Sequence, residues 1–140
     1  MGKYIILPNG RETNFTMVEL ACSHCGQFNF HPGVLDILQN AREDLNESMN
    51  ITSGCRCFIH NAAVGGVGGS THISDKPAYA NLGQLGTLAV DIHTPSGSYR
   101  GRLMAVLWKY KFTLGINFVK NFVHGDLRTL VNLEQTTFSY

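Results

Sequence analysis

Leu88–Thr94, with the sequence LAVDIHT, is the stretch that decides the fold. Its β-branched and apolar composition is that of a strand, and a strand turns successive side chains to opposite faces. One face carries Ala89, Asp91 and His93, and the other carries Leu88, Val90 and Ile92. A carboxylate in an otherwise apolar strand is costly unless it is paired, hydrogen-bonded or bound to a metal. The segment therefore predicts a buried strand with a polar site on one face.

Hydrophobic spacing predicts further elements on both sides of this strand. Two longer helices and a short one are predicted at 33–47, 99–112 and 61–64. Further strands are predicted at 4–7, 49–53, 113–119 and 122–127, the last two joined at Lys120 and Asn121. This order predicts one α+β domain over residues 1–140, with a small antiparallel sheet flanked by helices.

Composition excludes several classes of protein. Apolar residues form 44% of the chain and charged residues 15%, which favours a globular protein over a disordered one. The formal net charge of +1, without a Lys/Arg cluster, argues against binding to nucleic acid. The apolar runs are too short for membrane insertion or for a signal-peptide core, so we expect synthesis in a cytoplasm. Glycines concentrate between Gly54 and Gly101, which predicts a loop-rich middle.

The four cysteines form two close pairs, Cys22 with Cys25 and Cys55 with Cys57. In a cytosolic chain such pairs indicate metal or redox chemistry more than disulfides. A four-cysteine zinc site requires all four to converge, and the second pair has only one intervening residue. Small buried thiols are therefore the preferred interpretation.

Two further segments carry metal-ligand side chains. Phe122–Asp126 again places His124 and an aspartate on one face of a strand, and Ser70–His72 follows a glycine run that lets the backbone crowd a site. Catalytic zinc takes three His or carboxylate ligands and keeps one position open. His72, Asp91 and His124 could supply these ligands from three segments, although spacing alone fits hydrogen-bonded core histidines equally well.

A resemblance to a known family strengthens the zinc hypothesis. The matching stretches are Ser53–Arg56 (SGCR), His60–Gly66 (HNAAVGG), Ser70–His72 (STH), Ala89–Asp91 (AVD), Phe122–Arg128 (FVHGDLR) and, at the start, Leu20–Gly26 (LACSHCG). Together they resemble the zinc D-Ala-D-Ala carboxypeptidases and small phage endolysins, the LAS-type peptidoglycan peptidases, whose fold is shared by hedgehog signalling domains. The resemblance extends from about residue 16 to residue 128. It implies a hedgehog-like zinc peptidase fold.

Carried over residue by residue, the resemblance implies that His72, Asp91 and His124 bind Zn²⁺. Arg56 matches the arginine that holds a substrate carbonyl or carboxylate near the metal. A permanently charged guanidinium with several donors suits that task. Ser70 is expected to support the ligand loop or to contact substrate.

The chain departs from the family pattern in three places. Cys55 stands where the family has the tyrosine of Ser-Gly-Tyr-Arg, a change that we expect to affect packing more than chemistry. Between His72 and Asp91 lie 18 residues, a longer spacing than the family usually has. We therefore expect Ser74–Gly83 to form a loop beside the metal that narrows the cleft or acts as a lid.

Because of the third departure, the sequence does not identify the general base. Asn121 and Phe122 stand before His124, where the family commonly has a His or Glu. Asp126 and His93 are the candidates, and Asp126 is preferred. Orientation of a zinc-bound His124 is the alternative role for Asp126, since such carboxylates are common. His93 is otherwise expected to be a polar neighbour of the site that contacts substrate.

The resemblance implies a metallopeptidase whose partner is the peptide of bacterial peptidoglycan. No export signal or wall-binding module is visible, so we expect a monomeric phage endolysin. Such an enzyme is made in the host bacterial cytoplasm and reaches the periplasm and cell wall at lysis. Two alternatives stay open: a non-catalytic zinc-binding module, as in hedgehog domains, and a virion-mounted wall hydrolase used at entry.

Overall fold

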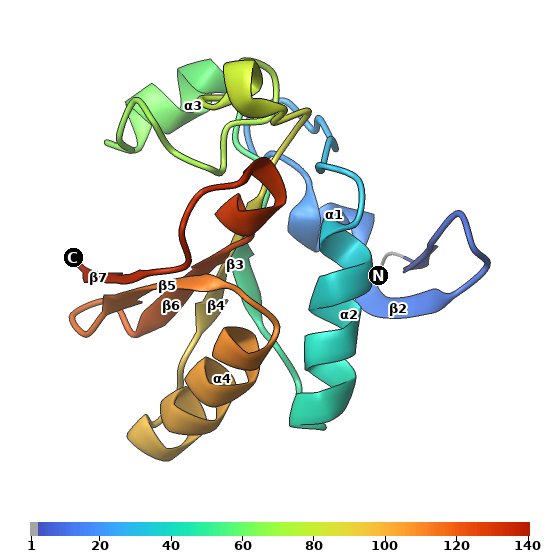
Figure 1. Ribbon diagram of the computed structural model, residues 1–140, viewed down its shortest axis with the longest axis vertical. Helices are drawn as coiled ribbons and strands as arrows, with labels where there is room; N and C mark the ends of the chain where they lie inside the picture. Colours follow the sequence, from blue (N-terminus) through green and yellow to red (C-terminus); the bar gives the residue numbers. More distant parts are fainter. Residues whose placement is uncertain (1–2) are drawn as a thin grey trace.

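A computed structural model describes residues 3–140 and shows a five-stranded sheet at the centre of the molecule (Figure 1). The strands, in their order across the sheet, are β3 (Ile51–Ser53), β4 (Ala89–His93), β6 (Phe122–Asp126), β5 (Thr113–Asn117) and β7 (Thr137–Ser139). Neighbours pair antiparallel except β5 and β7, which run parallel. The α+β class is confirmed. A wholly antiparallel sheet is wrong, because the chain after β6 turns back and adds β7 beside β5.

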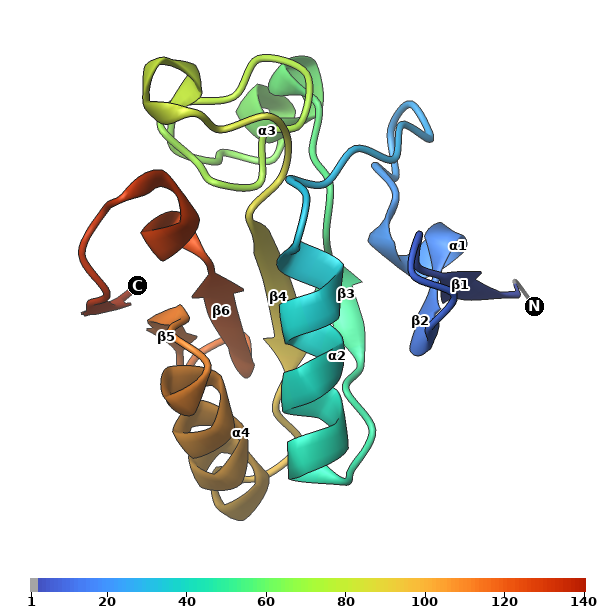
Figure 2. The ribbon, with the colours of Figure 1, turned by 45° about the vertical axis from the view of Figure 1, so that its right-hand side comes forward.

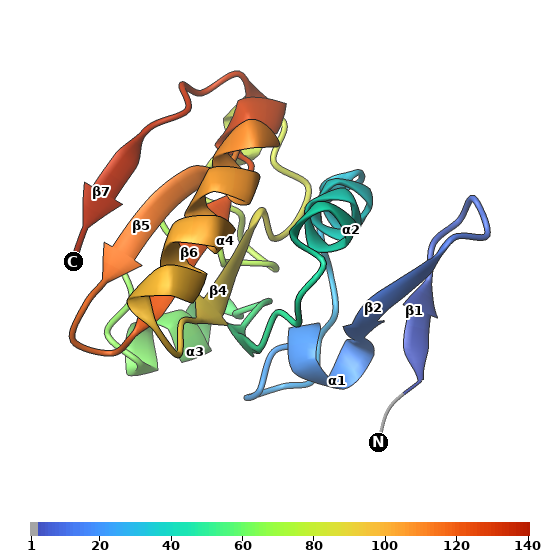
Figure 3. The ribbon, with the colours of Figure 1, turned by 90° about the horizontal axis from the view of Figure 1, so that it is seen from below.

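Two helices, α2 (Val34–Leu45) and α4 (Gly97–Lys109), pack against each other and against the sheet (Figures 2 and 3). Helix α4 begins two residues before the predicted start, because the Ser96 side chain accepts a hydrogen bond from the Tyr99 N–H and caps the helix. It ends at Lys109 rather than at residue 112, since Lys111 has a φ of 74° and leaves the helical region.

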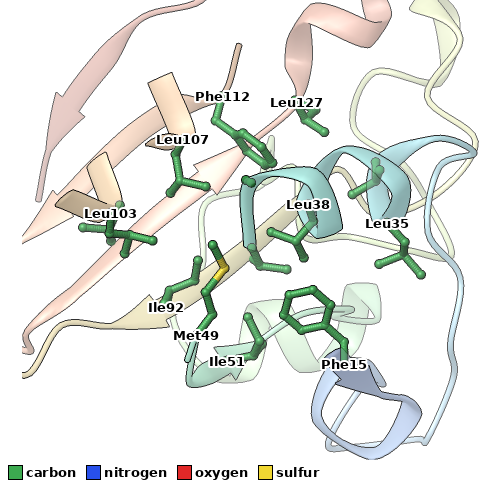
Figure 4. Packing of buried hydrophobic residues seen from close by; sticks show 14 of the residues in the cluster. Phe15, Leu35, Leu38, Met49, Ile51, Ile92, Leu103, Leu107, Phe112 and Leu127 are labelled. Atoms are coloured by element: carbon green, nitrogen blue, oxygen red, sulfur yellow. The ribbon is translucent and has the colours of Figure 1, made fainter. Parts of the chain in front are cut away.

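The main hydrophobic core lies between these helices and the sheet (Figure 4). Leu38 of α2, Leu103 and Leu107 of α4 and Ile92 of β4 are all 0% exposed. Burying each such side chain contributes about 1.5–3 kcal/mol. Because strand side chains alternate, packing Ile92 against the helices turns Asp91 to the opposite face of the sheet.

The remaining elements lie outside the five-stranded sheet. They are β1 (Tyr4–Ile6), β2 (Glu12–Thr16), α1 (Met17–Leu20), α3 (Phe58–Ala63) and the 3₁₀ turns η1 (Ala80–Leu82) and η2 (Arg128–Val131). The sequence patterns did not predict β2, α1 or β7. Helix α3 starts earlier than the predicted 61–64, because the Cys57 thiol caps it by accepting from the His60 N–H. Within the described residues, no helix has both the length and the apolar composition needed to cross a membrane.

Candidate metal centre

His72 lies in the loop after α3, which is held against the segment before that helix. The Arg56 N–H donates to the His72 carbonyl at 2.9 Å, and the Ser70 hydroxyl accepts from the His72 N–H at 3.2 Å. The ring Nδ1 of His72 lies 2.7 Å from the Gly54 carbonyl oxygen, so Nδ1 carries the proton and donates. That tautomer leaves the Nε2 lone pair free to bind a metal.

Asp91 and His124 reach the same point from neighbouring strands. They are directly opposite each other in the register of β4 and β6. Opposite residues of an antiparallel pair have close Cβ atoms on the same face. Here that face is the one turned away from α2 and α4, so both side chains meet His72 rather than the hydrophobic core.

The three donor atoms converge tightly. Asp91 Oδ1 lies 3.1 Å from His72 Nε2 and 3.2 Å from His124 Nδ1, and the two nitrogens are 3.2 Å apart. In a tetrahedral zinc site with bonds of about 2.1 Å, ligand atoms lie about 3.4 Å apart. The residues are only 2–6% exposed. We call His72, Asp91 and His124 the His–Asp group, and its donor set and spacing fit zinc.

Asp126 orients the third member of this group. Its Oδ2 lies 2.7 Å from His124 Nε2, which therefore donates and leaves Nδ1 for a metal. Arg128 forms a bidentate pair with Asp126 through Nε to Oδ1 at 2.9 Å and Nη2 to Oδ2 at 2.8 Å. The Thr71 hydroxyl donates to Oδ2 at 3.3 Å. Asp126 is 0% exposed, and both of its oxygens are engaged.

In this cluster the pKa values of the two carboxylates are lowered and that of His124 is raised. Burial raises the pKa of Asp91, but its electrostatic interaction and close contacts with His72 and His124 outweigh burial and hold that pKa well below its usual range. Burial lowers the pKa of His72. For His124 burial acts in the same direction, but hydrogen bonds to Asp126 and Asp91 dominate and raise the pKa to about 9. Burial opposes ionisation of Asp126, yet hydrogen bonds from Arg128 and His124 keep its pKa low. Asp91 and Asp126 are thus held in their ionised form.

Arg56 extends this centre toward solvent. Its Nη1 donates to Asn61 Oδ1 at 3.0 Å and its Nη2 to Ser53 Oγ at 3.2 Å, while Nη2 lies 3.6 Å from Asp91 Oδ2. Asn61 also donates to the Val67 carbonyl at 2.9 Å and thereby fixes the glycine loop. The guanidinium is therefore held rigidly beside the Asp91 carboxylate.

Two cavities meet at Arg56. One, of about 450 Å³, is lined by Arg56, Asp91 and the β3 segment, and the other, of about 460 Å³, is lined by Arg56, His72 and His124. Both volumes are typical of sites for small ligands. Tyr79, from the predicted 74–83 loop, lines the second cavity. That loop therefore borders the site as expected.

Comparison with known proteins identifies the family of this chain. A family model described as Peptidase M15 matches residues 13–126, which is most of the chain. The chain belongs to the peptidase M15 family. The resemblance inferred from its motifs is therefore confirmed. No curated protein and no solved structure gives a significant match.

For this M15 member, the structure brings most of the predicted site residues together. Six of them lie in one cluster: Arg56, Ser70, His72, Asp91, His124 and Asp126. His93 lies apart from them. It shares a strand face with Asp91 but lines another cavity with Glu47 and Tyr99, at the other end of β4.

The sequence patterns did not single out Asn61, Arg128 or Phe138 as parts of the site. Asn61 and Arg128 fall inside the matching stretches, so their spacing was a signal that could have found them. Phe138, whose ring centroid lies 5.5 Å from that of His124, comes from β7 and had no such signal.

Proposed function

We propose that this M15 family member is a zinc peptidase that hydrolyses a peptide bond in bacterial peptidoglycan. The observation that carries the proposal is the convergence of three buried donor atoms, with both histidine tautomers fixed, beside a rigid arginine. Zinc bound by the His–Asp group would polarise a scissile carbonyl and activate water. A ligand set of two histidines and one carboxylate is typical of catalytic zinc, which keeps one coordination position open.

Arg56 is the proposed substrate-binding residue. It lines both cavities, so a peptide lying across them passes the guanidinium and the His–Asp group together. Its bonds to Ser53 and Asn61 fix its position before substrate arrives. A guanidinium held in this way can bind a carboxylate or a carbonyl oxygen without further ordering.

Asp126 is proposed to orient His124, not to act as the general base. A base must reach the attacking water directly or through one bridging molecule. Asp126 is fully buried beneath His124 and is occupied by Arg128. Carboxylates in this arrangement fix the tautomer of a metal-binding histidine. Ser70, by accepting from the His72 N–H, is proposed to hold the ligand loop.

Digestion of purified peptidoglycan tests the proposal. The zinc-loaded protein is incubated with sacculi and soluble muropeptides, and the products are identified by mass spectrometry. We expect new peptide termini with the native protein, none after chelation, and recovery on adding zinc. The Asp91→Ala variant should yield no products. Hydrolysis that survives both chelation and this substitution would refute a zinc mechanism.

One observation favours a second candidate, a non-catalytic zinc-binding module. Among the described residues that line the two cavities, the carboxylates are Asp91 and Glu19. Glu19 Oε2 accepts hydrogen bonds from the Thr16 hydroxyl and N–H, which engages this carboxylate in the cap of α1. Stoichiometric zinc without turnover of sacculi or muropeptides would support this module.

The biological setting is a further proposal that follows from the motif resemblance. We propose a one-domain, monomeric phage endolysin that acts from the host cytoplasm on the wall at lysis. A virion-mounted hydrolase used at entry is the alternative. Detection of the protein in purified phage particles would favour entry, and its restriction to lysing cells would favour lysis.

A further inference from the structure

Three of the four cysteines converge at a place that the His–Asp group does not use. The sulfur atoms of Cys22, Cys25 and Cys57 lie within 4.8 Å of one another, and all three residues are free thiols. In a tetrahedral thiolate site with Zn–S bonds of about 2.3 Å, sulfurs lie about 3.8 Å apart. We infer that these residues, here called the cysteine group, form a second zinc site with a structural role.

The backbone around Cys22 is arranged for a thiolate. The Cys22 N–H donates to the Gln27 carbonyl and the Gly26 N–H donates to the Cys22 carbonyl, both at 2.8 Å, which closes the Cys-x-x-Cys turn. The Cys57 N–H donates to Cys22 Sγ at 3.4 Å. Burial opposes ionisation, but backbone N–H groups led by that of Cys57 lower the pKa of Cys22 to about 7. The thiolate is the form that binds metal.

Movement of the His24 side chain would supply a fourth donor, since its Nδ1 contacts Cys57 but does not lie within 4.8 Å of all three sulfurs. Structural zinc sites are closed by four nitrogen or sulfur ligands. His24 Nδ1 lies 3.5 Å from Cys57 Sγ, and its ring stacks on His60 with centroids 5.8 Å apart. Cys55 is not part of the group, because its sulfur lies outside the set of mutually close sulfurs and instead accepts from the Asn29 N–H at 3.3 Å.

Zinc at the cysteine group would join two segments that are far apart in sequence. Residues 22–25 follow α1, whereas Cys57 caps α3 and comes directly after Arg56. The ion would thus fix the backbone beside the arginine that borders the His–Asp group. The second metal would thus support the structure around the His–Asp group without taking part in its chemistry.

Metal analysis of the full chain tests the inference. The protein is expressed with zinc and desalted, and zinc per chain is measured by inductively coupled plasma mass spectrometry. We expect two zinc ions in the native chain, one in Asp91→Ala, one in Cys25→Ser and none in the double variant. Cys25 is exposed, so its substitution leaves the core intact. Cys55→Ala, a change at a buried cysteine outside the group, should keep both ions.

Cobalt provides a second readout. In the Asp91→Ala chain loaded with Co²⁺, thiolate-to-metal charge-transfer absorption should appear in the near ultraviolet and disappear on Cys25→Ser. His24→Ala should shift the visible cobalt bands, because a nitrogen ligand is lost. Unchanged bands would overturn the assignment of His24.

The outcomes separate this inference from the proposed peptidase. An Asp91→Ala chain without zinc would overturn the cysteine site, whether its thiols react freely or form a disulfide. Loss of a zinc ion from Cys55→Ala would overturn the assigned ligand set. Zinc that is lost in Cys25→Ser but not in Asp91→Ala would instead refute the His–Asp site and leave the cysteine site standing.

Discussion

The His–Asp group and the cysteine group are both clusters of metal ligands, but the fold supports them differently. Asp91 and His124 project from neighbouring strands in fixed register, and His72 is held by the Gly54 carbonyl. The cysteine group lies in connecting segments, and one member, Cys25, is exposed. Its supports are backbone N–H groups within a short turn and at the start of a six-residue helix.

This difference predicts what each metal does. The strand register and the Gly54 carbonyl position the His–Asp group whether or not an ion is present, so zinc there is free to serve chemistry. Cys22 and Cys57 pack only in a small cluster with Cys55 and Phe30, apart from the main core, and metal binding at such a site contributes to folding itself. We therefore expect loss of the first ion to remove function and loss of the second to loosen structure.

The largest effect is expected when the His–Asp group and the cysteine group are removed separately by substitution. Asp91→Ala should reduce muropeptide hydrolysis by about 10³-fold or more, because Lewis-acid stabilisation of several kcal/mol is lost. Its thermal unfolding should stay cooperative. Cys25→Ser should keep measurable hydrolysis but increase amide hydrogen exchange in residues 22–27 and 55–60. Product analysis and exchange mass spectrometry, run on both variants, make the comparison. If exchange rises equally along β4 in both variants, the two sites do not differ as argued.

The next largest effect concerns the orientation of His124. Asp126→Asn should weaken zinc binding at the His–Asp group by about 10- to 100-fold, because the carboxylate that fixes the Nε2–H tautomer is lost. Titration against a chelating dye measures this. Hydrolysis should recover in excess zinc. A general base would behave in the opposite way, with unchanged zinc affinity and low activity at saturating metal. Thr71→Val, which removes the 3.3 Å hydrogen bond to Asp126 and the 3.5 Å contact with His124 Nε2, is the control and should have a small effect.

The sequence predicted those parts of the fold and site that depend on local pattern. Alternation identified β4 and β6, and matched motifs identified the His–Asp group and Arg56. The parallel pairing of β7 with β5 was not predictable, because β7 is short and exposed along its whole length. The burial of Asp126 against Arg128 depends on how η2 follows β6, which no local sequence pattern predicts.

The cysteines show the same limit of prediction from local sequence patterns more clearly. The Cys-x-x-Cys spacing was visible and raised metal binding as a question, while small buried thiols were the preferred interpretation. Which cysteine joins Cys22 and Cys25 depends on the contact between the segment after α1 and the start of α3. That contact brings in Cys57 and leaves Cys55 packed against Asn29. Spacing alone did not separate Cys57 from Cys55.

A smaller effect is expected at the residue between the two sites. Arg56→Lys should retain zinc at both sites and lower kcat/KM by about tenfold, since an ammonium cannot keep both hydrogen bonds and contact substrate. Steady-state hydrolysis of a soluble muropeptide measures the change. Arg102→Lys is the matched control, because Arg102 pairs with Glu47 on the surface and should leave the kinetics unchanged. Unaltered kcat/KM in Arg56→Lys would remove Arg56 from substrate binding.

The smallest effect distinguishes the two faces of the sheet. A Cβ added at Gly115 would lie 2.3 Å from the ring of Phe138, which borders His124. Gly115→Ala should therefore displace β7 and cost about 1–3 kcal/mol of unfolding free energy through overpacking. Zinc binding at the His–Asp group should weaken only a few-fold, because its ligands lie on β4, β6 and the preceding loop. Denaturant unfolding with and without zinc measures both the change in unfolding free energy and the change in zinc binding.

Gly125→Ala provides the matched change on the opposite face. There the added Cβ would lie 3.3 Å from Phe112 and 3.4 Å from Leu107, which are contacts that small side-chain shifts can relieve. We expect a cost below about 1 kcal/mol and no change in zinc affinity. If Gly125→Ala weakened zinc binding as much as Gly115→Ala, the metal site would be coupled to the helical core. The sheet would then transmit packing changes from one face to the other, and the separation of core from chemistry argued from strand alternation would fail.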